Sequence, residues 1–146
     1  MKRAAICLTA VLVAGCATGG NDVADSGMSE PDKATMGRPA VEAMFGGKTE
    51  VGTSREGNKY SVYWSPDGTA RGTAKGDFGT DTDTGTWTVT ADGWFCREFS
   101  DWRNGNQGCW KVYDMGKQLV MIATSGNARD RKLAKSALKI GNSRDL

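Results

Sequence analysis

The chain has 146 residues, and its 19 Lys and Arg residues nearly balance 17 Asp and Glu residues, for a formal net charge of +2. It contains no histidine, which excludes catalysis by a Ser–His or Cys–His pair and any zinc site that needs a histidine ligand. Nucleic-acid binding depends on a strongly basic surface, and this composition provides no such excess.

The first fifteen residues have the layout of a secretory signal peptide. Lys2 and Arg3 give a basic start, and residues 4–15 form an uncharged, mostly apolar run. As a helix this run rises about 18 Å, which is too short for a bilayer core of about 30 Å. We therefore expect residues 1–15 to be a signal peptide and not a transmembrane helix. Its removal takes away two basic residues and no acidic one, so the mature chain is formally neutral and we expect no nucleic-acid partner.

The end of this segment resembles a known processing motif. Residues 12–16 read Leu-Val-Ala-Gly-Cys, which is similar to the lipobox of bacterial lipoproteins. The resemblance implies cleavage before Cys16, a lipid thioether on its sulfur and acylation of the new amine, because stable attachment needs more than one lipid chain. With Ala17 in place of an aspartate after the anchor, it also implies a lipid-anchored protein of the bacterial cell envelope, held in the outer membrane and facing the periplasm. Ordinary secretion with cleavage elsewhere is the alternative.

Beyond the anchor, the composition predicts a tether followed by a folded domain. Residues 16–38 are rich in Gly, Ser, Asp, Thr and Ala and have little to bury, which is typical of a flexible, disordered segment. Residues 39–146 are expected to form one β-domain. At its start, proline at position 39 and glycines at positions 46 and 47 predict a short helix, and we expect Met44 and Phe45 to cover one end or edge of the sheet.

From position 48 onward, the pattern is that of short strands separated by turns. Residues 84–90 alternate strictly, with Gly85, Trp87 and Val89 on one face and threonines on the other, which indicates a half-buried strand. Residues 76–83 are expected to form a loop. Short strands at regular spacing predict an all-β fold, a small antiparallel meander of about 7–8 strands that closes as a barrel or folds as a sandwich. The expected strands are residues 49–54, 60–64, 69–75, 84–90, 94–100, 109–113 and 117–124.

The four cysteines predict one disulfide. Cys7 leaves with the signal peptide and Cys16 carries lipid, which leaves Cys96 and Cys109. Two cysteines without a histidine do not complete a four-ligand zinc site, and their spacing is too long for a Cys-x-x-Cys redox centre. In an oxidising compartment we expect them to form a disulfide, which contributes about 3 kcal/mol for a loop of this length.

This disulfide conflicts with a tight turn at residues 104–105, where Asn-Gly is a strong two-residue hairpin signal. Such a turn would leave Cys96 about 14 Å out of register with Cys109, whereas bridged Cα atoms lie within about 7 Å. We therefore expect a wide or bulged loop that carries Trp102. Both faces of this hairpin are apolar, so we expect the helix or the tail to cover the outside of the barrel. One face is predicted to carry Phe95, Phe99, Trp110 and Val112, and the other Trp94, Cys96, Cys109 and Tyr113.

The tail, residues 129–140, is basic and allows two interpretations. Leu133, Ala134, Ala137 and Leu138 would line one face of a helix, whereas residues 136–140 could close the barrel as its last strand. We expect the strand. The basic side chains could meet lipid head groups or an anionic wall polymer, or could form a solvated face.

Two groups of residues are candidate binding sites. Asp77, Asp81 and Asp83 are spaced carboxylates of the kind found in calcium loops, which need further oxygen ligands; a solvated loop is the alternative. Trp102 and Arg103 lie in a polar loop, and an exposed aromatic residue beside an arginine is typical of a partner contact; packing of Trp102 over the barrel end is the alternative. We expect no catalytic residue, no metal cofactor and no organic cofactor, because no histidine can activate a nucleophile and no thiol stays free.

Four runs in the β-domain are similar to a family of small exported bacterial proteins of unknown function. They read SPDGTARG at 65–72, TGTWTV at 84–89, FCREFS at 95–100 and CWKVY at 109–113. The resemblance implies an exported β-domain with one disulfide, and it transfers no active site.

The sequence thus predicts a binding protein of the envelope and not an enzyme. We expect a protein- or ligand-binding β-domain, similar in architecture only to envelope lipoproteins that inhibit lysozyme or secreted proteases. Its partners would be the membrane, through Cys16, and an envelope or host protein. The alternatives are a structural lipoprotein that supports envelope integrity without a discrete ligand, and a barrel that carries a small molecule.

Overall fold

The structure is a single antiparallel sheet with one short helix. The computed structural model describes residues 27–125 and 127–146, so the predicted signal peptide and Cys16 lie outside the described residues. Within that range, helix α1 (Arg38–Phe45) precedes nine strands in the sheet order β8-β7-β6-β5-β4-β3-β2-β1-β9. The strands are β1 (Lys48–Thr53), β2 (Lys59–Trp64), β3 (Thr69–Gly76), β4 (Gly79–Val89), β5 (Phe95–Phe99), β6 (Gly108–Asp114), β7 (Gln118–Ala123), β8 (Arg131–Ala134) and β9 (Leu138–Ile140), with the 3-10 turns η1 (Trp102–Gly105) and η2 (Lys135–Ala137).

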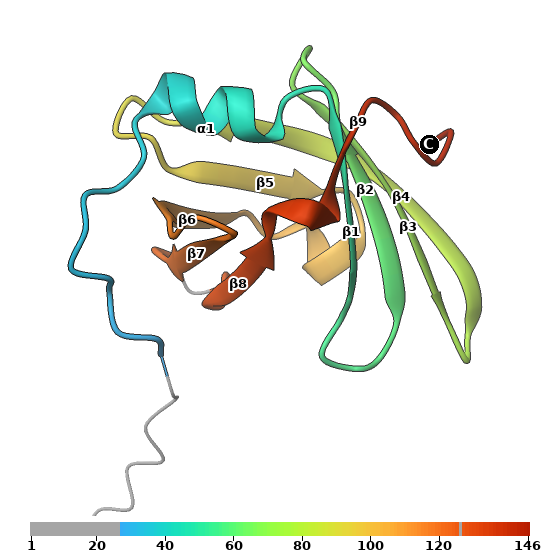
Figure 1. Cartoon of the computed structure of the whole chain (residues 1–146). Helices are drawn as coiled ribbons and strands as arrows, with labels where there is room; N and C mark the ends of the chain where they lie inside the picture. Colours follow the sequence, from blue (N-terminus) through green and yellow to red (C-terminus); the bar gives the residue numbers. More distant parts are fainter. Residues whose placement is uncertain (1–26, 126) are drawn as a thin grey trace, which may run out of the picture.

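The sheet curls into a nearly closed barrel (Figure 1). Each strand from β1 to β7 pairs with the next one along the chain, and β9 then pairs with β1 through Lys48 opposite Ile140. The short turn η2 joins β8 at one edge of the sheet to β9 at the other, so the tail itself bridges the two edges. The predicted all-β meander is confirmed as a barrel. It has nine described strands where the sequence predicted about 7–8, because the tail forms two short strands; the helical interpretation of residues 129–140 is wrong.

One predicted loop is a strand. Residues 76–83 were expected to be irregular, but β4 begins at Gly79 and pairs with β3 from Gly76 opposite Gly79 onward. A turn of two residues, Asp77 and Phe78, connects these strands. The reason is local: threonines alternate with aspartates in this stretch, and a β-branched side chain fits a strand better than a loop.

Helix α1 closes one end of the barrel. Proline follows Arg38 in its first turn, and Gly47 ends it with a φ of 72°, a backbone conformation that favours glycine. The helix buries Val41 and Phe45, both 0% exposed. Figure 1 shows the helix lying across the upper end of the strands. At this end of the barrel lies a group that we call the aromatic cluster. It consists of Phe45 of the helix and of three rings from the sheet side, Trp64, Trp87 and Phe95.

The disulfide hairpin has the predicted register. Cys96 lies directly opposite Cys109, with Cα atoms 4.1 Å apart, and the two form the disulfide. Residues 100–107 form a wide loop around η1 with no two-residue turn, as expected. The predicted faces are also confirmed, because one set of hairpin side chains belongs to the barrel core while Tyr113 belongs to a separate outer patch. The core members from this hairpin are Phe95, Phe99, Trp110 and Val112.

The outer patch is covered by the segment that precedes α1. Met28 packs against Tyr113, Val120 and Ile122, and the Met36 backbone N–H donates to the Val112 carbonyl oxygen at 2.8 Å. Residues 27–36 therefore lie along the barrel, although the sequence placed them in a flexible tether. They also take the covering role that was expected of the helix or the tail. Among the residues described, no helix combines the length and the apolar character that crossing a membrane requires.

Candidate ligand-binding cavity

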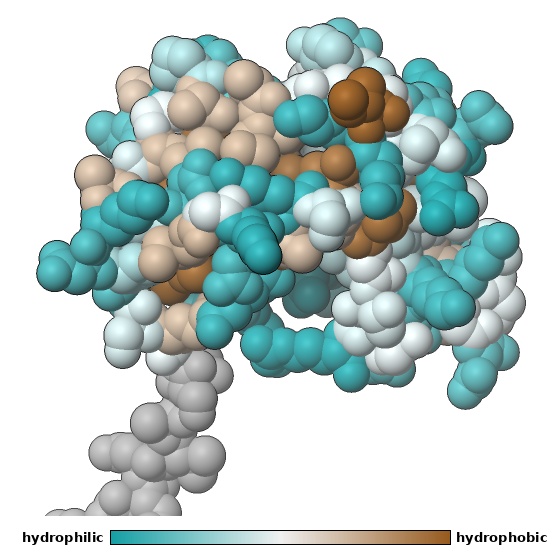
Figure 2. Space-filling model, viewed as in Figure 1, coloured by the Kyte–Doolittle hydropathy of each residue, from teal (hydrophilic) through white to brown (hydrophobic). Residues whose placement is uncertain are grey.

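The half of the barrel away from α1 is hollow. A cavity of about 630 Å³ is lined there by side chains from the strands β1 to β6 and β8, from η1 and from the residues around Asn127. Its outer part is formed by the β1–β2 turn, the β3–β4 turn and η1, which lie at the end of the strands opposite the helix. Figure 2 shows the molecule hollowed on this side, with hydrophilic side chains around the opening. Ligand sites in proteins have volumes of about 300–1,000 Å³, so this cavity has the size of a small-molecule site.

A buried ion pair forms one wall of the cavity. Glu50 of β1 is 1% exposed, and its Oε1 accepts hydrogen bonds from Arg131 Nη1 at 2.6 Å and from the Tyr60 hydroxyl at 2.9 Å. Arg131 Nη2 also donates to Glu50 Oε2 at 3.3 Å. The pair links β8 to β1 across the gap between the two edges of the sheet, so it supports closure of the barrel.

The charge states of these groups follow from their contacts. Burial by itself raises the pKa of Glu50, but the Arg131 guanidinium and the two hydrogen-bond donors outweigh burial and hold that pKa below its ordinary value. Burial and the neighbouring Glu50 carboxylate both raise the pKa of Tyr60. Glu50 is therefore an anion at neutral pH, and Tyr60 keeps its hydroxyl proton and donates a hydrogen bond to Glu50.

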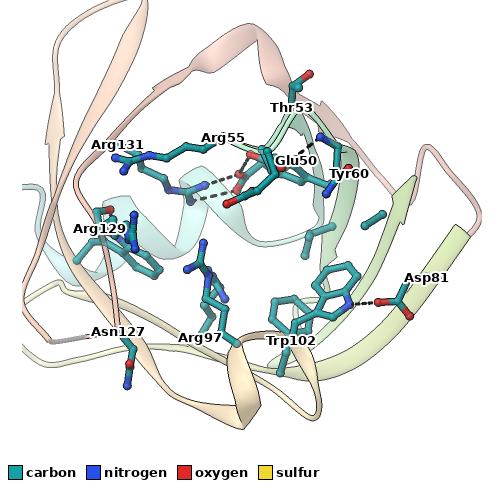
Figure 3. A pocket seen from close by; sticks show the side chains of 18 of the residues that line it. Glu50, Thr53, Arg55, Tyr60, Asp81, Arg97, Trp102, Asn127, Arg129 and Arg131 are labelled. Atoms are coloured by element: carbon teal, nitrogen blue, oxygen red, sulfur yellow. Dashed lines mark hydrogen bonds and ion pairs between the residues drawn. The ribbon is translucent and has the colours of Figure 1, made fainter. Parts of the chain in front are cut away.

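Arg97 is the second arginine in the cavity, and its contacts are different. Its guanidinium carbon lies 5.5 Å from the centre of the Phe99 ring and 5.1 Å from that of Trp110. Within residues 27–125 and 127–146 no acidic side chain forms an ion pair with it and no acceptor binds its N–H groups. Figure 3 shows the side chain pointing into the open space. Burial first, and repulsion from Arg131 and Arg103 second, lower the pKa of Arg97 to about 10, so it remains charged at neutral pH.

Two further donors at the cavity lack a partner. Trp64 Nε1 and Arg131 Nε are both buried, and neither has an acceptor among the residues described. Both residues line the cavity. A buried donor left without an acceptor costs about 1–3 kcal/mol, and native structures retain few of them. The unmatched groups at this site are all donors, which points to acceptors in whatever occupies the space.

The rim of the cavity is positively charged overall. Arg55, Arg103, Arg129 and Lys132 all line it. Of the acidic rim residues, Asp130 accepts hydrogen bonds from two backbone N–H groups, those of Met28 and Ala123. Asp81 accepts one from Trp102 Nε1 at 2.8 Å. These two carboxylates are thus engaged by donors of their own. Glu56 also lines the cavity, so four basic side chains face three acidic ones at the opening.

The predicted contact residues Trp102 and Arg103 both lie at this cavity. Trp102 packs against Phe99, with ring centres 5.0 Å apart, and is only half-buried. Its ring also lies over Gly72, where a Cβ would collide with it. Trp102 therefore packs over the barrel end and forms a wall of the cavity, while Arg103 is exposed at the rim. Their contact with a protein partner stays a prediction.

The three aspartates proposed as a calcium loop have other positions and partners. Asp83 is 7% exposed, and its carboxylate accepts hydrogen bonds from the backbone N–H groups of Thr84, Asp101 and Trp102. Burial raises the pKa of Asp83, but these hydrogen bonds outweigh burial and lower it. Asp77 lies in the exposed β3–β4 turn, and no group of three potential ligand residues comes together in the described part of the chain. Asp83 instead fixes the loop that carries Trp102.

No family model, no curated protein and no solved structure matches this chain. The fold and the cavity define the chain as a small antiparallel β-barrel with a donor-rich interior. Its resemblances to bacterial lipoproteins and to a family of exported proteins stay predictions.

Sequence analysis identified none of Glu50, Tyr60, Arg97 and Arg131 as a site residue, although they form the polar centre of the cavity. One of them carried a usable signal. Arg97 stands between Phe95 and Phe99 at the alternate positions of one strand, and the same alternation that buried both phenylalanines placed Arg97 beside them. A charged residue inside an otherwise apolar face is an indication of a site.

Proposed function

We propose that this protein is a lipid-anchored protein of the bacterial envelope whose barrel binds a small organic molecule in its cavity. The observation that carries the proposal is the cavity of about 630 Å³ with its unmatched hydrogen-bond donors. Small barrels normally fill their interior with side chains, and those that hold one small ligand leave part of it open. This barrel is filled by aromatic rings at the helix end only.

The proposed activity is binding without chemical conversion. The cavity offers a buried ion pair, a guanidinium between two rings and several aromatic walls. These groups recognise and orient a molecule, and the sequence supplies no histidine to activate a serine or threonine. The ligand is therefore held and released unchanged, which is the behaviour of a carrier or a sensor.

The proposed anchor would keep the cavity close to the membrane. Met28 donates its backbone N–H to Asp130, a rim residue, at 2.6 Å. Twelve peptide steps separate Cys16 from Met28, and such a chain spans no more than about 43 Å. If Cys16 carries lipid, the opening of the barrel lies within this distance of the outer membrane, on its periplasmic side.

Native mass spectrometry of the protein purified from bacterial envelopes tests the two parts of this proposal. We expect the intact mass to show loss of residues 1–15 and addition of acyl chains at Cys16, and a second species with a bound small molecule. The control is Ala74→Trp, which replaces a small lining residue with one that fills the cavity, and we expect this variant to lose the bound species. An unlipidated chain that still begins at Met1 overturns the anchor, and the same bound species in both variants overturns the ligand site.

A further inference from the structure

The cavity has hydrogen-bond donors and positive charge without matching acceptors, and this excess defines the class of ligand that would fit it. Glu50 accepts hydrogen bonds from Arg131 and Tyr60, and among the residues described it forms an ion pair with Arg131 and not with Arg97. Trp64 Nε1 and Arg131 Nε are buried donors without acceptors, and the half-buried Arg97 forms no ion pair with any residue described. A neutral polar ligand would satisfy some of these donors, but it would leave Arg97 without a contact ion pair and with only the more distant attraction of Glu50, which raises the pKa of Arg97 against burial and the neighbouring arginines.

The surroundings of Arg97 suit an anion. The Phe99 and Trp110 rings contact the guanidinium through their π-faces, and such contacts use none of its five N–H donors. The rings also place apolar surface beside the guanidinium, and an ion pair is stronger where the local dielectric constant is low. Burial first, and repulsion from Arg131 and Arg103 second, lower the pKa of Arg97 to about 10, while Glu50 and Tyr60 act in the opposite direction. An anion at this place relieves the repulsion between the arginines.

The rest of the cavity suits an apolar body. Val62, Ala74, Phe99 and Trp102 present carbon surface on the side of β2, β3 and η1. The rim cations Arg55, Arg129 and Lys132 face the opening, where they attract an anion as it approaches. An amphipathic molecule would therefore enter with its charged head first and leave its apolar part against Trp102 and Ala74.

We infer that the ligand is an amphipathic organic anion whose oxyanion head, a carboxylate or a phosphate, binds the Arg97 guanidinium. The inference rests on the proposed function, since it names the class of molecule that the cavity takes. Arg97 is then the residue that determines specificity, and Arg131 serves mainly to hold Glu50. Charge-assisted hydrogen bonds between a guanidinium and an oxyanion are about twice as strong as neutral ones, so the charge of the head should dominate selectivity.

A matched pair of probes tests the head group. Dansyl-labelled undecanoic acid and its methyl ester share one apolar body, and they differ in the charge of one end. We expect the full-length mature protein to bind the acid at least about tenfold more tightly than the ester, as judged by the rise in dansyl fluorescence. Arg97→Gln should remove that preference and bring the acid down to the affinity of the ester. Arg97→Lys should retain part of it, because the charge remains without the planar fork.

Two controls separate the inference from the proposed function. Arg38→Gln removes the same charge from the exposed surface of α1, and it should leave both affinities unchanged within about threefold because exposed charges contribute little. Ala74→Trp should abolish binding of both probes. Equal binding of acid and ester to the unmodified protein, or an unchanged preference in Arg97→Gln, overturns the oxyanion head and leaves the ligand site standing. Failure of both probes to bind overturns the site itself.

A competition titration distinguishes a carboxylate head group from a phosphate head group. Dodecanoate and dodecyl phosphate carry the two oxyanions on the same chain, and each is titrated against the dansyl acid. Stronger displacement by dodecanoate assigns a carboxylate, and stronger displacement by dodecyl phosphate assigns a phosphate. Displacement by dodecanol at the same concentrations contradicts the inference, because dodecanol has the chain without the charge. Far-UV circular dichroism and the unfolding midpoint of Arg97→Gln show that the variant is folded when binding is measured.

Discussion

The two ends of this barrel are built on opposite principles. At the helix end, Phe45 stacks on Phe95 with ring centres 4.3 Å apart, and Trp64 meets Phe95 edge-on at 5.1 Å. At the other end the same sheet encloses a cavity of about 630 Å³, with Arg97 unpaired inside it. The first end is closely packed and the second is open, although the strands between them are continuous.

The difference indicates that one end of this small domain provides stability and the other end provides the cavity. Burial of aromatic rings is the main stabilising interaction available to a chain of this size, and the aromatic cluster concentrates it under α1. The open half forgoes close packing and keeps buried donors without acceptors, an arrangement that lowers stability. Proteins tolerate such features where a binding site requires them. Substitutions at the two ends should therefore have different consequences, for stability at the closed end and for affinity at the open end.

Phe95→Ala should have the largest effect on stability. Phe95 is 0% exposed and contacts the other three members of the aromatic cluster. Truncation of a buried phenylalanine costs about 3–5 kcal/mol, and we expect a loss of this size in the free energy of unfolding measured with urea. Phe95 is not among the lining residues of the cavity, so the affinity for the dansyl acid should change by less than about threefold at temperatures where the variant is folded.

The same chemical change at an exposed position provides the control. Phe78 lies in the β3–β4 turn and is 58% exposed, so Phe78→Ala should change stability by less than about 0.5 kcal/mol. Equal losses for Phe95→Ala and Phe78→Ala would mean that the closed end does not carry the stability of the barrel.

Glu50→Gln should have the next largest effect. It leaves the Arg131 guanidinium without its counter-charge, and breaking a buried ion pair costs about 3–5 kcal/mol. The Arg131 side chain is 26% exposed and therefore partly solvated, so we expect a loss nearer about 2 kcal/mol. The double variant Glu50→Met with Arg131→Met should recover most of it, because no uncompensated charge remains. A double variant that is no more stable than Glu50→Gln would show that the pair acts through packing.

The pH dependence of stability provides a second readout for the same residue. The pKa of Glu50 is lowered in the folded barrel, so its contribution is fully present above the ordinary glutamate pKa and is lost as the pH falls through the lowered folded value. The unmodified protein should therefore lose stability in acid more steeply than Glu50→Gln does. Parallel acid profiles for the two proteins would contradict an ionised Glu50 in the folded state.

The closed end could be predicted from the sequence and the polar centre could not. Alternation in residues 84–90 placed Trp87 on the apolar face of a half-buried strand, and alternation around the disulfide placed Phe95 and Phe99 on one face together, because the face of a strand is a local pattern. The disulfide followed from counting cysteines. The proline and the paired glycines that bound α1 are local signals as well.

The ion pair depends on contacts between distant parts of the chain. Glu50 and Arg131 are 81 residues apart and meet only because the tail brings β8 and β9 to the two edges of the sheet. The basic tail was interpreted as a surface for lipids or wall polymer, or as solvated, and Arg131 in fact points inward to Glu50. Two of the aspartates were expected in a loop and lie in β4 instead, and nothing local indicates that Asp83 would accept three backbone N–H groups from its own strand and a distant loop.

Arg97→Met should have the smallest effect on stability, and it gives the sharpest contrast with Glu50→Gln. Removing a buried charge that has no acidic partner relieves a desolvation cost and loses two ring contacts, so we expect the free energy of unfolding to change by less than about 1 kcal/mol.

The pKa of Arg97 is lowered to about 10 in the folded state, and the unfolded chain therefore binds more protons as the pH rises through that value. Stability should then rise with pH in the unmodified protein relative to Arg97→Met, and the difference between the two urea titrations isolates this one group. The dansyl acid should meanwhile bind Arg97→Met at least about tenfold more weakly. A loss of stability as large as that of Glu50→Gln would make Arg97 a structural residue, and the open half of the barrel would then be organised for folding in the same way as the closed half.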